Sequence, residues 1–167
     1  MKKLLTMAAA LIALHSAYGA NVAEDLIKGF EGFRPSVYVC KAGRATIGYG
    51  FTSKRMVAKG RVTEAEASAE LSRLCKGIAL KLRKELGEGN TLKPHEEAAL
   101  VSFIYNIGWT NFKNSTMCRL LKQGRRGAVV GVEFHKWNKI TKDGKKVVLK
   151  GLARRRTREA RLFLGIA

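Results

Sequence analysis

The chain has 167 residues, of which 32 are Lys or Arg and 13 are Asp or Glu, so its formal net charge is +19. This length fits one domain with its own core and excludes two full-sized domains. So basic a surface attracts nucleic acids and anionic cell-envelope polymers alike, and the charge alone does not choose between them. We favour a solvated cationic coat over a dedicated basic groove.

Residues 1–20 have the organisation of a secretory signal, with two lysines, an apolar run and a small-residue tail. The apolar run covers the 11 residues 4–14, fewer than the roughly 20 that span a bilayer stably. We expect a cleaved signal, and the alternative is a releasable anchor that tethers the protein to the inner membrane for a time. Both interpretations export the protein, to the periplasm or outside the cell, and leave 21–167 as the folded domain.

Apolar residues at helical spacing predict a helix over 21–30, and Gly32 is a suitable stop. Glu31 therefore falls at the C-terminal end of this helix. The helix dipole there and the neighbouring Phe30 and Phe33 favour the protonated form of its carboxyl group. A Glu standing alone at a helix end would be an ordinary solvated residue, so its importance depends on its surroundings.

β-Branched and aromatic residues over 37–52, interrupted by three glycines, predict a small bent β sheet. Next, Thr63-Glu-Ala-Glu66 predicts a capping box that opens a long helix through Leu82. This helix would connect the small sheet lobe to the rest of the chain.

Pro94 opens an apolar helix to Gly108 that we expect to form the axis of the core. In the later segment 128–138 we expect Val129, Val132, Phe134 and Trp137 to be packing residues. Further along the chain we predict helices at 115–124, 128–138 and 152–164. Between the last two we predict a turn at 141–144.

Four segments carry a recognisable pattern: 30–50, 99–108, 112–116 with the nearby 120–121, and 151–163. In this order they resemble those of the phage-type lysozymes (endolysins, glycoside hydrolase family 24), and the resemblance covers 24–165. It implies an α+β, two-lobed lysozyme-like fold, with a small β-sheet lobe and a larger helical lobe joined by a long helix. It also implies a monomeric muramidase that cuts the β-1,4 bond between N-acetylmuramic acid and N-acetylglucosamine without a cofactor.

Glycoside hydrolysis needs a protonated acid and a second group that activates water or stabilises the transition state. In the resemblance, Glu31 matches the acid and Thr46 the hydroxyl that holds the attacking water. Cys40 falls where most of the family has Asp, and some exported members use Cys there. A thiol has a pKa of ~8.5 against ~3.9 for Asp, but Lys41 and Arg44 nearby would favour the thiolate. We expect Cys40 to position or activate water.

Three cysteines, Cys40, Cys75 and Cys118, cannot all pair within one chain. A disulfide between Cys75 and Cys118 would leave Cys40 available for chemistry. A disulfide that includes Cys40 would instead silence it. We favour the catalytic thiol.

Arg154 to Arg156 and Glu159 resemble family positions that line or brace the cleft, and Arg155 is the candidate partner of Glu31. Tyr105 and Asn106 fit either the glycan site or the core. His95 and His135 show no metal-ligand spacing with the cysteines, so we expect no metal.

Two other functions remain open. One is a thiol-dependent peptidoglycan amidase or peptidase, with Cys40 as nucleophile and His95 or His135 as base. The other is a non-catalytic, cationic, envelope-binding bactericidal protein. In each case the expected partners are peptidoglycan and anionic envelope polymers, with possible membrane association through the N-terminus and no specific nucleic acid.

Overall fold

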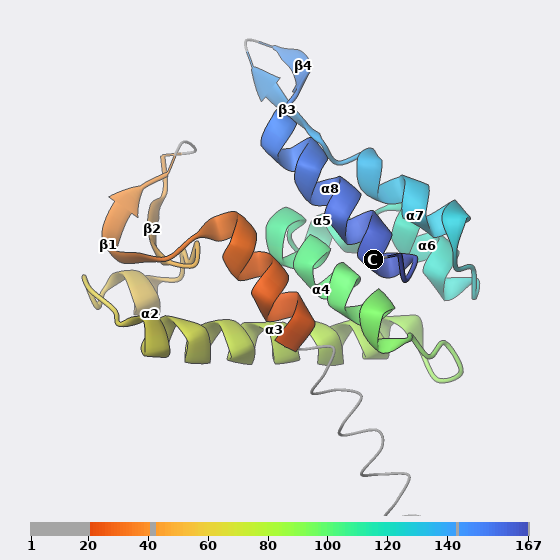
Figure 1. Ribbon diagram of the computed structural model, residues 1–167, viewed down its shortest axis with the longest axis horizontal. Coiled ribbons are helices and arrows are strands. Elements are labelled where there is room, and N and C mark those ends of the chain that lie inside the picture. The colour runs from red at the N-terminus through yellow and green to blue at the C-terminus, as the bar shows by residue number, and fades with distance from the viewer. Residues whose placement is uncertain (1–20, 41–42, 143, 167) are drawn as a thin grey trace, which may run out of the picture.

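The computed structural model describes residues 21–40, 43–142 and 144–166 (Figure 1). The predicted signal or anchor at 1–20 lies outside the described residues. The small lobe begins after a helix at 21–31 and contains two strands and a short helix, β1 (Arg34–Val39), β2 (Ala45–Gly48) and α2 (Lys54–Val57). The larger lobe is helical and carries a second hairpin; its elements are α4 (Pro94–Ile107), α5 (Trp109–Lys113), α6 (Thr116–Lys122), α7 (Ala128–His135), β3 (Lys139–Lys142), β4 (Lys145–Val148) and α8 (Lys150–Phe163).

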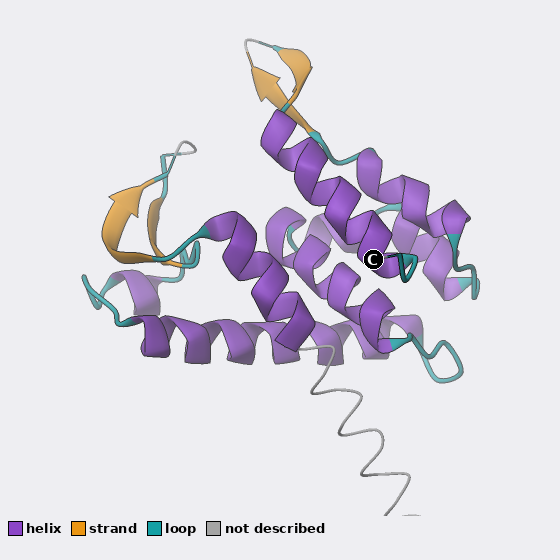
Figure 2. Ribbon diagram, viewed as in Figure 1, coloured by secondary structure: helices purple, strands orange, loops and turns teal. Residues whose placement is uncertain are grey.

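Helix α3 (Glu64–Leu86) runs from the small lobe along the base of the helical lobe (Figure 1). The predicted capping box is present: Thr63 Oγ1 accepts from the backbone N of Glu66 at 3.2 Å, and the Glu66 carboxylate accepts from the backbone N of Thr63 at 2.9 Å. The two lobes and the long connecting helix confirm the predicted α+β fold (Figure 2).

Helix α4 is the axis of the core, as its apolar sequence predicts. Its residues Ala98 and Val101 pack in the cluster of the small lobe, with Ile27, Ile47 and others. Its residues on the other side, Phe103 among them, pack in the cluster of the helical lobe. One buried helix therefore ties both lobes together.

Three expectations for the helical lobe are wrong. Helix α7 ends at His135, and its Val129 and Val132 are 38 % and 56 % exposed, because Val130 and Phe134 form its buried face. Thr141, placed in a turn by its sequence, belongs to strand β3. Two short helices without a strong periodic signal were also not expected, α2 in the small lobe and α5 in the helical lobe.

Glu70 links α2 to α3. It forms ion pairs with Arg55 and with Arg73, whose Nη2 lies 2.8 Å from Glu70 Oε1. The hydrogen bonds from Arg73 lower the pKa of Glu70 to about 2. A lowered pKa means that the ionised group stabilises the fold above its ordinary pKa, and that this stability is lost as pH falls toward 2.

We expect Glu70→Gln to lower the free energy of unfolding at pH 6 by no more than about 1 kcal/mol, since both arginines are mostly exposed. The difference from wild type should shrink as pH falls from 5 to 2. Urea denaturation of both proteins across this range measures it. A difference that stays constant down to pH 2 would exclude the ion pairs as its source.

In the part of the chain that the structure describes, no helix has both the length and the apolar character needed to cross a membrane.

Candidate active site

Glu31 is the last residue of the helix at 21–31, as the sequence predicts. The backbone N of Gly32 donates to the carbonyl O of Lys28 at 3.0 Å, and Gly32 has φ +67°, a left-handed conformation that ends the helix. The Glu31 side chain is 25 % exposed. Its carboxyl group is thus fixed in direction and still open to solvent.

Arg155 of α8 holds this carboxyl group. Its Nη1 lies 2.5 Å from Glu31 Oε1, which confirms the predicted pair, and the Arg155 side chain is only 4 % exposed. Arg155 Nε donates to Glu159 Oε1 at 3.0 Å, and its Nη2 donates to the carbonyl O of Ser102 at 3.2 Å. Because three acceptors fix one planar guanidinium, Arg155 presents Nη1 to Glu31 in a single orientation.

Behind Arg155 lies a buried polar network. Glu159 and Arg156 are both fully buried, and Arg156 Nη1 lies 3.0 Å from Glu159 Oε2. Ser102 Oγ donates to Glu159 Oε1 at 2.8 Å, and Arg156 Nη2 donates to Asn106 Oδ1 at 2.5 Å. Burial raises the pKa of Glu159 and lowers the pKa of Arg156 to about 10. Each charge therefore depends on its partners.

The small lobe meets Glu31 from the opposite side. A Cβ on Gly50, which has φ +92°, would lie 3.3 Å from Glu31 Oε2, so only glycine lets the turn approach this closely. Tyr105 of α4 donates from its hydroxyl to the carbonyl O of Tyr49 at 2.7 Å, which fixes the turn against the helical lobe. Burial raises the pKa of Tyr105, so its phenol stays neutral.

Thr46 and Cys40 lie together on the β1–β2 hairpin. Thr46 is opposite Tyr38, and both Thr46 Oγ1 and the backbone N of Cys40 donate to the carbonyl O of Arg44, at 2.9 and 3.0 Å. Cys40 is therefore a diagonal cross-strand neighbour of Thr46. Thr46 is 3 % exposed, and its hydroxyl, having donated its hydrogen, keeps lone pairs that can accept a bond from water. Gly50, four residues after Thr46, lies so near Glu31 that an added Cβ would meet the carboxylate.

Cys75 and Cys118 are buried thiols in separate core clusters, so the disulfide considered between them is not formed. Neither is linked to Cys40. Burial raises the pKa of Cys75 to about 12 and also raises that of Cys118, so both stay protonated. The core has no need of a cross-link there because both thiols pack as small apolar groups.

The two histidines considered as bases are in the helical lobe. His95 is in the first turn of α4, where its ring lies beside Gly165, and His135 ends α7. Both helices belong to the helical lobe, whereas the β1–β2 hairpin that carries Cys40 belongs to the small lobe (Figure 1). In the described ranges, no three His, Cys, Asp or Glu side chains gather as a metal ion would require.

Residues 28–159 match the phage lysozyme family, a span that includes Glu31, Cys40, Thr46 and Arg155. The chain belongs to the phage lysozyme family. Among its relatives in that family is the endolysin of Acyrthosiphon pisum secondary endosymbiont phage 1, with 35 % identity over 83 % of this chain and 92 % of the relative.

Solved structures agree with this assignment. An endolysin from Escherichia coli O157:H7 phage FAHEc1 has a TM-score of 0.73 and 31 % identity, over 86 % of this chain and 90 % of that one. The muramidase domain of SpmX from Asticaccaulis excentricus has a TM-score of 0.71 and 34 % identity, over 85 % and 94 %. The lysozyme-like fold predicted from the four sequence segments is confirmed.

Sequence reasoning missed two parts of the site. Ser102 gave no signal of its own, because it lies in the apolar run of α4. The sequence predicts Gly50 only as a glycine that bends the sheet, although in the structure it leaves room for the Glu31 carboxylate. The one available signal for the network is that Glu159 follows Arg155 by four residues, a spacing at which two side chains can meet on a helix.

Proposed function

We propose that the protein is a peptidoglycan muramidase that hydrolyses the β-1,4 bond between N-acetylmuramic acid and N-acetylglucosamine, with Glu31 as general acid. The observation that carries this proposal is the position of the Glu31 carboxyl group, which Arg155 holds at 2.5 Å while a quarter of the side chain stays exposed. A fixed and accessible carboxyl group can protonate a glycosidic oxygen as the bond breaks. Membership of the phage lysozyme family supports the same reaction.

In the proposed reaction, Glu31 donates its proton to the leaving oxygen, and water attacks the anomeric carbon. Cys40 and Thr46 hold this water: the Thr46 hydroxyl accepts a hydrogen bond from it, and the Cys40 thiolate takes its proton. Their common tie to the carbonyl O of Arg44 supports this joint role, because it fixes both on one end of the hairpin. Attack on the face opposite the leaving oxygen would invert the anomeric configuration.

The products of purified peptidoglycan distinguish this reaction from its rivals. We expect the reduced wild-type protein to release reducing sugar ends and no stem peptides. Release of stem peptides without reducing ends would favour the amidase or peptidase. Release of neither, with bacterial killing intact, would favour the cationic binder, which the net charge of +19 keeps as a candidate.

The role of Cys40 predicts opposite effects of two substitutions. Cys40→Asp should keep or raise reducing-end release and extend it to lower pH, since a carboxylate is ionised far below the ~8.5 of a thiol. Cys40→Ser should lower kcat about a hundredfold, because a hydroxyl does not serve as the base. Kinetics over pH 4 to 9 measure both, with Cys75→Ala as a control on a buried thiol. Loss of activity in Cys40→Asp with full activity in Cys40→Ser would refute the role.

We further propose that residues 1–20 export the protein, as a cleaved signal or a releasable anchor, and that anionic envelope polymers attract its cationic surface. N-terminal sequencing of the protein recovered from the periplasm and from membranes distinguishes the two leader types.

A further inference from the structure

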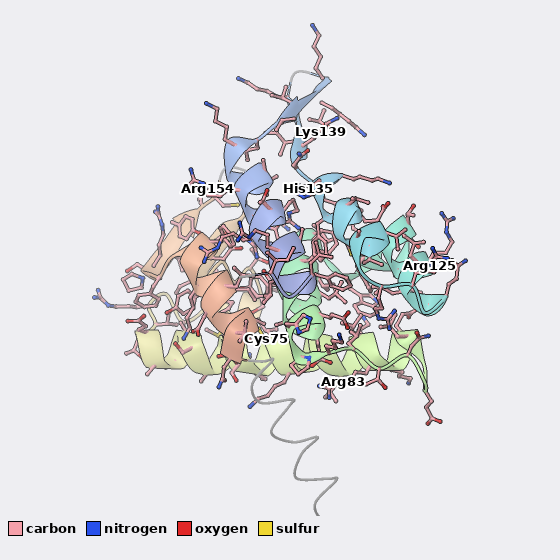
Figure 3. All side chains as sticks on the ribbon, turned by 45° about the vertical axis from the view of Figure 1, so that its right-hand side comes forward. Cys75, Arg83, Arg125, His135, Lys139 and Arg154 are labelled. Atoms are coloured by element: carbon pink, nitrogen blue, oxygen red, sulfur yellow. The ribbon has the colours of Figure 1, made fainter. Side chains whose placement is uncertain are left out.

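The β3–β4 hairpin stands out from the helical lobe, beyond the N-terminal end of α8 (Figures 1 and 3). Its strands pair antiparallel in four pairs, from Lys139↔Val148 to Lys142↔Lys145, and all of these residues are exposed. Both faces of the hairpin therefore meet solvent. Neither the packing of the two lobes nor the proposed reaction requires an exposed hairpin of this composition.

Four aliphatic side chains on and next to this hairpin are exposed to solvent. Ile140 and Val147 face each other across the strands at 41 % and 46 % exposure, and Val148 and Leu149 follow at 50 % and 43 %. None of the four belongs to either core cluster of the described residues. Exposed aliphatic groups gathered in this way, rather than scattered singly, indicate a surface that is covered by a partner.

Cations surround these aliphatic groups. The segment 139–154 contains six Lys or Arg residues and one acid, Asp143. Among the described residues, none of these six cations forms an ion pair with a carboxylate. The labelled Lys139 and Arg154 lie on the hairpin and at the adjoining end of α8 (Figure 3). The six are Lys139, Lys142, Lys145, Lys146, Lys150 and Arg154.

We infer that the β3–β4 hairpin docks on an anionic phospholipid surface. The lysines would lie at the phosphate level, while the cross-strand pair Ile140 and Val147, which shares one face of the hairpin, enters the boundary between headgroups and acyl chains. This pairing of basic and aliphatic groups is what an anionic membrane interface binds. A second copy of the chain is a poor occupant, because its lysines would meet these lysines.

A glycan fits the hairpin less well. Sugars are bound by aromatic faces and by amide or carboxylate groups, and the two strands contain only Lys, Ile, Thr and Val. Peptidoglycan stem peptides offer carboxylates to the lysines but little apolar surface to the aliphatic groups. The aliphatic groups thus favour lipid over wall polymer.

Co-sedimentation of the full-length protein with vesicles tests the inference. We expect wild type to bind phosphatidylglycerol vesicles at least tenfold more tightly than phosphatidylcholine vesicles. Lys142→Gln/Lys146→Gln should weaken binding to phosphatidylglycerol at least tenfold. The matched control is Lys76→Gln/Lys84→Gln, which removes two exposed cations from α3 and should change binding less than twofold. Residues 1–20 are the same in wild type and in every variant, so a difference in vesicle binding between them comes from the substituted residues.

The aliphatic contribution needs its own pair of variants. Ile140→Ser/Val147→Ser should weaken vesicle binding at least threefold, whereas Leu80→Ser, at a 64 % exposed position of α3, should not. Ile140→Trp should become sensitive to quenching by brominated phosphatidylglycerol, and Leu80→Trp should not. Circular dichroism spectra that match wild type confirm that each variant is folded.

Unchanged vesicle binding in both hairpin variants would overturn the inference. Equal losses of binding to vesicles and to purified peptidoglycan, without quenching of Ile140→Trp, would also overturn it and make the hairpin a polyanion site of the wall. Reducing-end release by the wild-type protein is a separate measurement. The inference and the proposed muramidase activity can therefore fail independently.

Discussion

Glu31→Gln is expected to lower the rate of reducing-end release from peptidoglycan at least about a hundredfold. The Gln side chain keeps the size of Glu31, and its carbonyl oxygen still accepts from Arg155, but it has no acidic proton to give to the leaving oxygen. Steady-state release from purified peptidoglycan measures the change. Because only proton donation is removed, binding of the variant to insoluble peptidoglycan should equal that of wild type.

Asp25→Asn is the matched control for Glu31→Gln. It removes one carboxylate from an exposed position of the same helix, so it makes the same change in charge away from Arg155. We expect its activity to stay within about twofold of wild type. If Glu31→Gln released reducing ends at the wild-type rate, Glu31 would not be the acid. If it lost this activity and still killed bacteria, the cationic surface would have a second, non-enzymatic action.

The sequence predicts those parts of the site whose positions depend on residues close together in the chain. Glu31 is placed by the end of an amphipathic helix and by Gly32, and the start of α3 is placed by the Thr63 capping box. These features depend on residues within four positions of one another. The pairing of Arg155 with Glu31 spans 124 positions, and it was expected only because both residues match places in one family pattern.

Other parts depend on tertiary contacts that leave no local signal. The sequence around Ser102 indicates only a core residue, because its partner Glu159 on α8 is 57 positions away in the chain. Val129 and Val132 read as packing residues, yet α7 buries a different face. The β3–β4 hairpin was missed because Lys on both of its faces obscures the alternation by which a half-buried strand is recognised.

Glu159→Gln is expected to lower the free energy of unfolding by about 3–5 kcal/mol, because it leaves the fully buried Arg156 without a counter-charge. Urea denaturation at pH 7 measures it. Glu85→Gln is the control: its carboxylate pairs with Lys113 and Lys122, which are at least half exposed, so its loss should cost about 1 kcal/mol or less. A similar loss in both variants would contradict the role of the buried network.

A double variant separates the stability of the network from its effect on Glu31. Glu159→Met/Arg156→Met removes both buried charges, so it should recover most of the stability lost in Glu159→Gln. Arg155 would still have lost its bond from Nε to Glu159 and would hold Glu31 less firmly. We therefore expect kcat to stay reduced, about tenfold, with KM unchanged. Recovery of stability and kcat together would mean that Glu159 serves the fold alone, and that Ser102 and Glu31 suffice to orient Arg155.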